Sequence, residues 1–139
     1  MLKTIKPLSK KILSTKLAIF GKVPTEWKEQ LEIQFDCTFA EGYEDNDYID
    51  EALINEAQRK AKFAEWVIIF AHTETERLPK NQHQLIRSVH LLNENLIVLV
   101  RSKTLSHLPW ETNAKAIIQC DENVSWEELK LQLFKEEII

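Results

Sequence analysis

Residues 66–71 read Trp-Val-Ile-Ile-Phe-Ala, and this run decides the fold because it contains no polar residue. An apolar run of this length is typical of a strand that helices cover on both faces. Residues 17–20 and 96–100 have the same character. We therefore predict a parallel sheet whose three central strands are formed by these runs.

Two weaker strands are expected at the edges of this sheet. Residues 33–39 and 115–120 alternate apolar and polar side chains, which indicates strands with one face in water. Wholly apolar strands at the centre and alternating strands outside match the flavodoxin-like order 2-1-3-4-5. Right-handed crossovers then place helices on both faces. The sequence predicts a single three-layer α/β domain over residues 16–139, preceded by a basic arm, residues 1–15.

Helical periodicity and candidate capping residues predict helices in the segments between the strands. Thr25, Asp47 and Ser125 are candidate N-caps, and Ser125 with Glu128 forms a capping-box pattern. The expected helices span residues 25–34, 48–64, 81–92 and 125–137.

The charge of the chain is unevenly distributed. The net charge is −4, yet the first 22 residues carry six lysines and no acid. Such an arm could contact an acidic partner, or it could fold against the acidic remainder of its own chain. Nucleic acid is the weaker expectation, because the arm has no arginine or aromatic side chain to stack on a base.

Cysteine usage and hydropathy favour a cytoplasmic protein. The two cysteines, Cys37 and Cys120, are expected to be buried free thiols rather than a disulfide framework. No run approaches the roughly 18 apolar residues of a membrane span. Residues 1–14 lack the continuous apolar core of a secretory signal.

The carboxyl ends of the predicted strands are the natural place for a ligand. The polar residues at these ends are Lys22, His72, Glu74, Arg101 and Lys103. Together they could bind a small anion or nucleotide; the alternative is that they are solvated loop residues. The chain has only two glycines, Gly21 and Gly42, so a glycine-rich phosphate loop is missing and no cofactor is expected. No metal site is expected either, because His83 and His90 lack a third ligand of matching spacing.

The predicted strand order and length resemble those of a phosphate-accepting receiver domain. That resemblance implies acids at the ends of strands one and three, where this chain has Phe20-Gly21-Lys22 and Ala71-His72; Lys103 is similar to the receiver's lysine. Residues 66–137 are also similar in rhythm to a small G domain. However, residues 21–25 do not form its phosphate loop, and residues 101–104 do not form its guanine-reading motif. If the chain descends from either family, it has lost the residues that carry out that family's phosphate or nucleotide chemistry.

Without a phosphate loop or a nucleophile–base pair, we expect a non-enzymatic binding or regulatory module. It would act as an adaptor, an immunity-type partner or a subunit of a larger assembly. The alternative is a divergent α/β domain that binds a nucleotide or another small molecule, and an enzyme falls within this alternative. Pairing along the edge strand 33–39 could also produce a homodimer. The expected partner contacts are Lys3, Lys6, Lys10, Lys11, Phe35 and Trp110.

Overall fold

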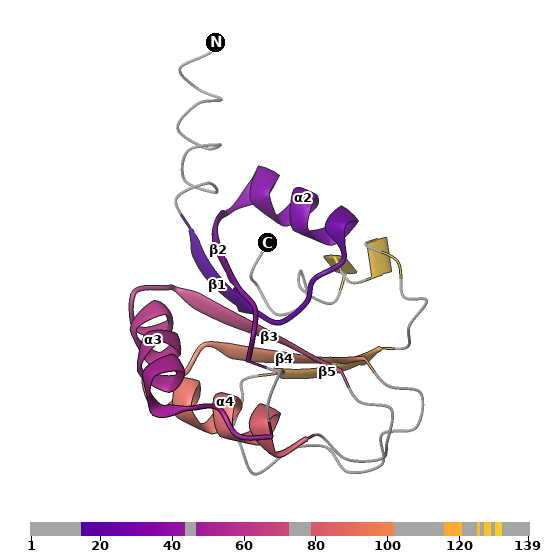
Figure 1. Cartoon of the computed structure of the whole chain (residues 1–139). Coiled ribbons are helices and arrows are strands. Elements are labelled where there is room, and N and C mark those ends of the chain that lie inside the picture. Colours follow the sequence, from indigo (N-terminus) through magenta and orange to yellow (C-terminus); the bar gives the residue numbers. More distant parts are fainter. Residues whose placement is uncertain are drawn as a thin grey trace.

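The computed structural model describes residues 15–43, 47–72, 79–101 and 116–120, together with residues 125, 127, 128, 130 and 131. Its sheet runs in the order β2-β1-β3-β4, with every pair parallel, and β5 pairs with the outer side of β4 (Figure 1). The strands are β1 (Lys16–Phe20), β2 (Asp36–Ala40), β3 (Trp66–His72), β4 (Leu96–Arg101) and β5 (Ala116–Cys120). The predictions of a parallel α/β sheet and of the order 2-1-3-4 are confirmed.

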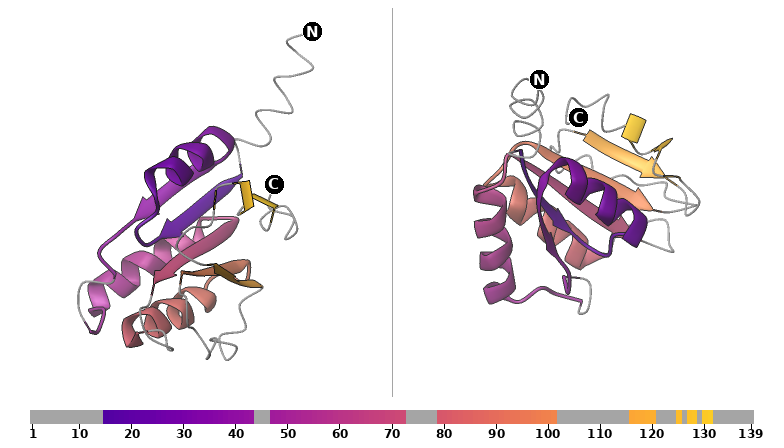
Figure 2. Two further views of the ribbon diagram at one scale, coloured as in Figure 1. Left: turned by 90° about the vertical axis from the view of Figure 1, so that its right-hand side faces the viewer. Right: turned by 90° about the horizontal axis from the view of Figure 1, so that it is seen from above.

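Helices cover both faces of this sheet. The described helices are α2 (Thr25–Gln34), α3 (Glu51–Lys62) and α4 (Lys80–His90). Figure 1 and Figure 2 show α3 and α4 together on one face and α2 on the opposite face. Within the described part of the chain, no helix has the length and apolarity needed to cross a bilayer.

Alternate side chains of the central strands enter two separate cores. Ala18 and Phe20 of β1 belong to the cluster beneath α3 and α4. Leu17 and Ile19 pack instead with Trp27 of α2. These four side chains of β1 are each at most 2% exposed, and only the first residue of the strand, Lys16, is exposed. The apolar runs therefore contain no polar residue because neither of their faces meets water.

The predicted edge strand 33–39 is wrong at its start. Helix α2 continues to Gln34, and β2 begins only at Asp36. Phe35 ends the helix in an extended conformation, and its N–H donates to the Leu31 carbonyl. Its side chain is 3% exposed and packs in the α2 core, whereas Ile33 is 66% exposed. The alternating pattern thus combined a helix end with a short strand.

Two predicted helix caps are also corrected. Helix α3 begins after Asp50 rather than Asp47, because an Asp50 carboxylate oxygen accepts a hydrogen bond from the Leu53 N–H at 2.9 Å. Helix α2 begins after Pro24 with no side-chain cap bond, and Thr25 is its first helical residue. At the predicted C-terminal helix, the Ser125 hydroxyl does accept from the Glu128 N–H, at 3.2 Å.

The end of α3 is tied to the loop before β4 by Asn93. Its side-chain amide donates to the carbonyls of Ala61 and Ala64, both at 2.9 Å. Its side-chain oxygen accepts from the Asn95 N–H at 2.9 Å. Asn93 therefore satisfies carbonyls that the last turn of a helix leaves without an intrahelical donor.

Gly21 lies where β1 ends against β3. Its φ is +110°, and a Cβ placed there would collide with the backbone carbonyl oxygen of Phe70. Its N–H donates to the Ala40 carbonyl of β2 at 2.9 Å. Gly21 thus joins three strands in a backbone conformation that other residues rarely adopt.

We predict that Gly21→Ala destabilises the domain substantially. The unfavourable φ costs about 1–3 kcal/mol, and the collision with Phe70 adds to that. Urea denaturation followed by circular dichroism measures the free energy of unfolding, with Lys22→Ala as the neighbouring control. Equal stability of the two variants would contradict this account of the strand junction.

Cys37 of β2 is a half-buried free thiol in the structure. Its Sγ donates to the Leu31 carbonyl at 3.4 Å. Burial, with smaller contributions from Glu32 and Asp36, raises the pKa of the Cys37 thiol to about 12. Since this value exceeds that of an unfolded thiol, about 8.5, the thiol favours the folded state below that pH. Its contribution is lost as the pH rises toward 12.

We predict that Cys37 reacts slowly with a thiol reagent in the folded protein, because the thiolate is the reactive species. The Cys120→Ser variant leaves Cys37 as the sole thiol, so the release of thionitrobenzoate from Ellman's reagent reports on it alone. At about pH 8.5, the ordinary thiol pKa, the folded protein should react far more slowly than the urea-unfolded protein. Equal rates would refute a strongly raised pKa.

Candidate functional site

The carboxyl ends of β1, β3 and β4 meet at one edge of the sheet. His72 and Arg101 are register partners at the ends of β3 and β4. Lys22 follows β1 and is exposed. The backbone therefore brings these three predicted ligand-binding residues to the same edge. Glu74 and Lys103, the other two, lie outside the described residues.

The predicted partner contacts have different outcomes. The buried Phe35 cannot serve as a surface contact, because its ring fills the core beneath α2. Its polar neighbour Asp36 is exposed. Trp110 and the arm residues Lys3, Lys6, Lys10 and Lys11 lie outside the described part of the chain.

A cavity of about 340 Å³ lies at the amino-terminal end of α4. Its described lining residues are Asp47, Tyr48, Pro79, Lys80 and Asn81. Tyr48 is 66% exposed, while Asn81 is only 5% exposed. An exposed phenol ring, a carboxylate, an ammonium group and a carboxamide therefore surround one hollow.

A buried pair of carboxamides lies at the start of α4, and one of the two, Asn81, lines this cavity. Gln82 is 2% exposed, and its side-chain nitrogen lies 3.4 Å from the side-chain oxygen of Asn81, as donor and acceptor. These two are the buried polar side chains among the residues that the structure describes. Because a buried amide is costly without a partner, this contact stabilises the burial of both side chains at the start of α4.

The loop that carries Asp47 and Tyr48 is fastened to α4 by Gln84. The Gln84 side-chain oxygen accepts from the Ile49 N–H at 2.9 Å, and its nitrogen donates to the Ile49 carbonyl at 2.8 Å. The Gln84 side-chain amide thus bonds both the N–H and the carbonyl of Ile49, as a residue of a neighbouring β-strand would. Earlier in the same connection, Tyr43 is 2% exposed, and its ring meets that of Phe20 edge-on at 5.4 Å. Burial, followed by the charge of Glu56, raises the Tyr43 pKa.

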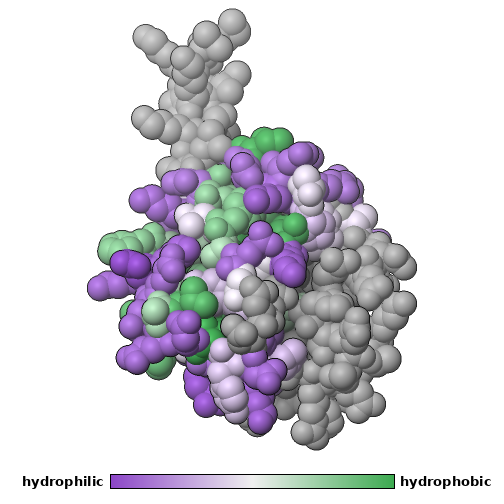
Figure 3. Space-filling view, viewed as in Figure 1, coloured by the Kyte–Doolittle hydropathy of each residue, from purple (hydrophilic) through white to green (hydrophobic). Residues whose placement is uncertain are grey.

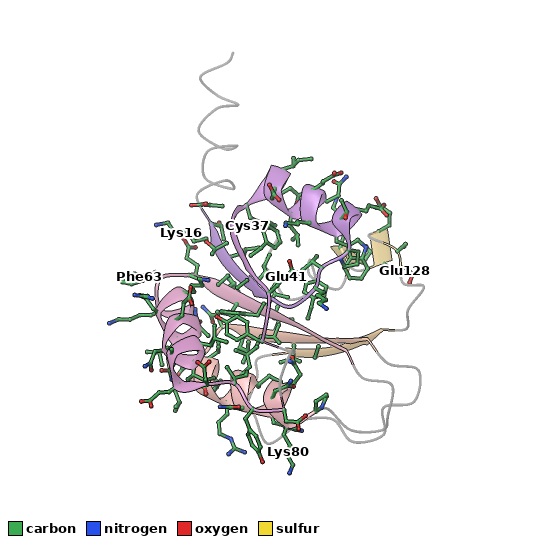
Figure 4. All side chains as sticks on the ribbon, in the orientation of Figure 1. Lys16, Cys37, Glu41, Phe63, Lys80 and Glu128 are labelled. Carbon is green, nitrogen blue, oxygen red and sulfur yellow. The ribbon has the colours of Figure 1, made fainter. Side chains whose placement is uncertain are left out.

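This arrangement suits a small polar molecule better than a metal ion. Pockets for small molecules combine apolar and aromatic side chains with a few polar groups that fix the orientation of the ligand. Across the described ranges, no group of three His, Cys, Asp or Glu side chains is placed to hold a metal. Figure 4 shows Lys80 at the α4 end, far from Cys37 on β2.

The sequence interpretation missed Asn81, Gln82 and Gln84. The apolar face of α4 includes Leu85 and Ile86, and Gln82 lies one helical turn before both. Extending that face backward would have placed amides at buried positions. Tyr48 was missed for another reason, since it was assigned to a helix that in fact begins at Glu51.

No protein-family model matches the chain. Over 93 residues it is 30% identical to the thermostable beta-glucosidase B of Acetivibrio thermocellus, a match that covers 58% of this chain and 12% of that protein. A GH3 beta-glucosidase from Bifidobacterium adolescentis has a similar fold, with a TM-score of 0.54 and 21% identity. That match covers 76% of this chain and 20% of the solved one.

The general stress protein 14 of Treponema denticola, solved with FMN, has a TM-score of 0.48 and 12% identity. That match covers 90% of this chain and 98% of the Treponema chain. The chain thus spans a fifth or less of each of the two beta-glucosidases described above. The likeness to the Bifidobacterium structure is a likeness of fold.

We predict that Gln84→Ala loosens the loop beside the cavity. The substitution leaves the Ile49 N–H and carbonyl without their side-chain partner, which costs about 1–3 kcal/mol for a buried group. Urea denaturation measures the loss, and His83→Ala is the matched control on the preceding helical position. Should the two variants unfold at the same urea concentration, Gln84 does not fasten the loop.

Proposed function

We propose that this chain is a non-catalytic α/β module of the kind found within beta-glucosidases, acting through protein contacts as part of a larger assembly. The observation that carries the proposal is the 30% identity over 93 residues to a beta-glucosidase of which the match covers only 12%. A match to so small a part leaves most of the relative's structure outside this chain.

The chemistry of glycoside hydrolysis supports a non-catalytic role. Most glycosidases place two carboxyl groups about 5–9.5 Å apart across the bond that they cleave. Asp47 is the only carboxylate among the described residues that line the cavity beside α4. A hydrolytic site would need its second carboxylate from elsewhere.

The proposal includes finer features of the domain. We take it to be a five-stranded, three-layer, flavodoxin-like unit that works in the cytoplasm. The register between Arg101 of β4 and Cys120 of β5 supports the fifth strand. The free thiol of Cys37 suits a reducing compartment.

A second candidate function is the binding of a small molecule at the cavity beside α4. The exposed ring of Tyr48 and the buried amide of Asn81 favour it. A glucoside would present a ring face to the phenol and hydroxyl groups to the amide. A nucleotide bound at the strand ends near Lys22 is the other form of this alternative.

The chain alone should not hydrolyse an aryl β-glucoside, because the described residues bring one carboxylate, that of Asp47, to the cavity beside α4. Release of nitrophenol, measured with the purified chain, checks this expectation, and Asp47→Asn is the control for trace activity. Turnover that disappears in the Asp47→Asn variant would overturn the non-catalytic proposal.

Two-dimensional NMR distinguishes the two candidate functions. Under the first proposal, methyl β-glucoside and ATP leave the amide shifts near Tyr48, Asn81 and Lys22 unchanged. Saturable shifts that Tyr48→Ala abolishes, and that the equally exposed control Phe63→Ala retains, would favour sugar binding. Shifts with ATP that Lys22→Ala weakens would favour a nucleotide site.

A further inference from the structure

The outer side of β2 is a sheet edge whose backbone groups have no strand partner among the residues that the structure describes. The Asp36 N–H donates to the Thr15 carbonyl at 3.0 Å, and the Ala40 carbonyl accepts from Gly21. Since peptide groups alternate sides along a strand, those of Cys37 and Phe39 point away from β1. No described segment pairs with β2 on that side.

A groove runs beside this edge, on the face that α3 covers only in part. Its volume is about 310 Å³, and it is lined by β1, β2 and the second half of α3. Asp36 and Thr38 of β2 are exposed there, and Phe63, just after α3, is 69% exposed. On the other face Ile33 is 66% exposed. Figure 3 shows green apolar patches between purple residues on this view of the molecule.

Charge is polarised along β2. Three cations, Lys16, Arg59 and Lys60, and one carboxylate, Asp36, line the groove near the beginning of the strand, so the cations outnumber the carboxylate there. Lys60 also pairs with Glu56 at 3.2 Å. The opposite end of the strand leads to the exposed Glu41. Figure 4 shows Lys16 and Cys37 toward one end of the β1–β2 pair and Glu41 toward the other.

From these observations we propose that β2 binds a second copy of this chain, strand to strand and antiparallel, to form a symmetric dimer. Centring the pairing on Thr38 aligns Cys37 of each copy with Phe39 of the other. The two outward peptide groups of each strand then form four hydrogen bonds across the interface. The proposal rests on the β2 edge and does not depend on the proposed function.

The antiparallel orientation is the one that charge favours. It brings Glu41 of each copy toward the end of the other copy's β2, where Lys16, Arg59 and Lys60 outnumber Asp36 in the groove lining. A parallel arrangement would instead oppose like charges. The exposed rings of Phe63 and side chains of Ile33 flank the paired strands, so they would lose contact with water in the dimer. A two-fold interface of this kind closes and does not propagate into fibres.

Sedimentation velocity of the full chain tests the dimer over about 1 µM to 1 mM, the range in which weak complexes dissociate. The dimer fraction should rise with concentration. Thr38→Lys should abolish it, because two lysines would then face each other on the symmetry axis. Thr25→Lys is the matched control, an exposed threonine at the start of α2, and should dimerise normally.

Charge reversal tests the orientation. Glu41→Lys and Arg59→Glu should each weaken association about fivefold. The double variant restores an opposite-charge pair across the interface and should recover most of that loss. Independent, additive effects of the two substitutions would contradict the antiparallel arrangement.

A disulfide tests the register. In a Cys37→Ser, Cys120→Ser background, Thr38→Cys should form a cross-linked dimer on mild oxidation, since directly opposite Cβ atoms lie about 4.5–5.5 Å apart. Asp36→Cys should not, because its symmetry mate is four residues away along the ladder. A protein that stays monomeric over the whole concentration range would overturn the proposal, and would favour another segment, such as residues 1–14, as the occupant of the edge.

Discussion

The pairing of β1 with β3 is the constraint on which the rest of the structure depends. These two strands are buried on both faces, so the chain can place polar chemistry only at their ends and along the outer strands. Gly21 ends β1 against the Phe70 carbonyl, where no Cβ fits. The β1–β3 pair lies between β2 on one side and β4 on the other, so both outer strands depend on it for their position.

The apolar runs predicted the centre of the fold well. The strands at residues 16–20, 66–72 and 96–101 coincide with them to within one or two residues. Composition also predicted the order 2-1-3-4, because strands buried on both faces must lie inside the sheet. Local patterns failed where tertiary contacts decide the outcome. Phe35 has the spacing of a strand residue, yet it ends a helix because its ring fills the core beneath α2.

The candidate site was less predictable than the fold. Sequence order indicates which residues follow each strand, and this was enough to place His72 beside Arg101. It does not indicate that Gln84 would reach a loop 35 residues away and fasten Ile49. Nor does helical periodicity alone show that Asn81 and Gln82 are buried, because amides at a helix start usually meet water. Long-range hydrogen bonds of this kind become visible only in three dimensions.

Two parts of the sheet have different surface properties: the edge formed by the carboxyl ends of the strands, and the outer side of β2. The carboxyl edge carries the small cavity beside α4, which matters if a ligand binds. The β2 edge carries peptide groups that no described strand pairs, together with polarised charge, which matter if a protein binds.

Native-state amide hydrogen exchange at low protein concentration tests the central claim most directly. The account predicts that amides of β1 and β3 exchange only through global unfolding, as expected for the most buried strands. The outward amides of Cys37 and Phe39 should exchange rapidly, in contrast to those of Thr38 and Ala40 in the same strand. Uniform protection along β2 would contradict the open edge, and rapid exchange in β3 would contradict the buried centre.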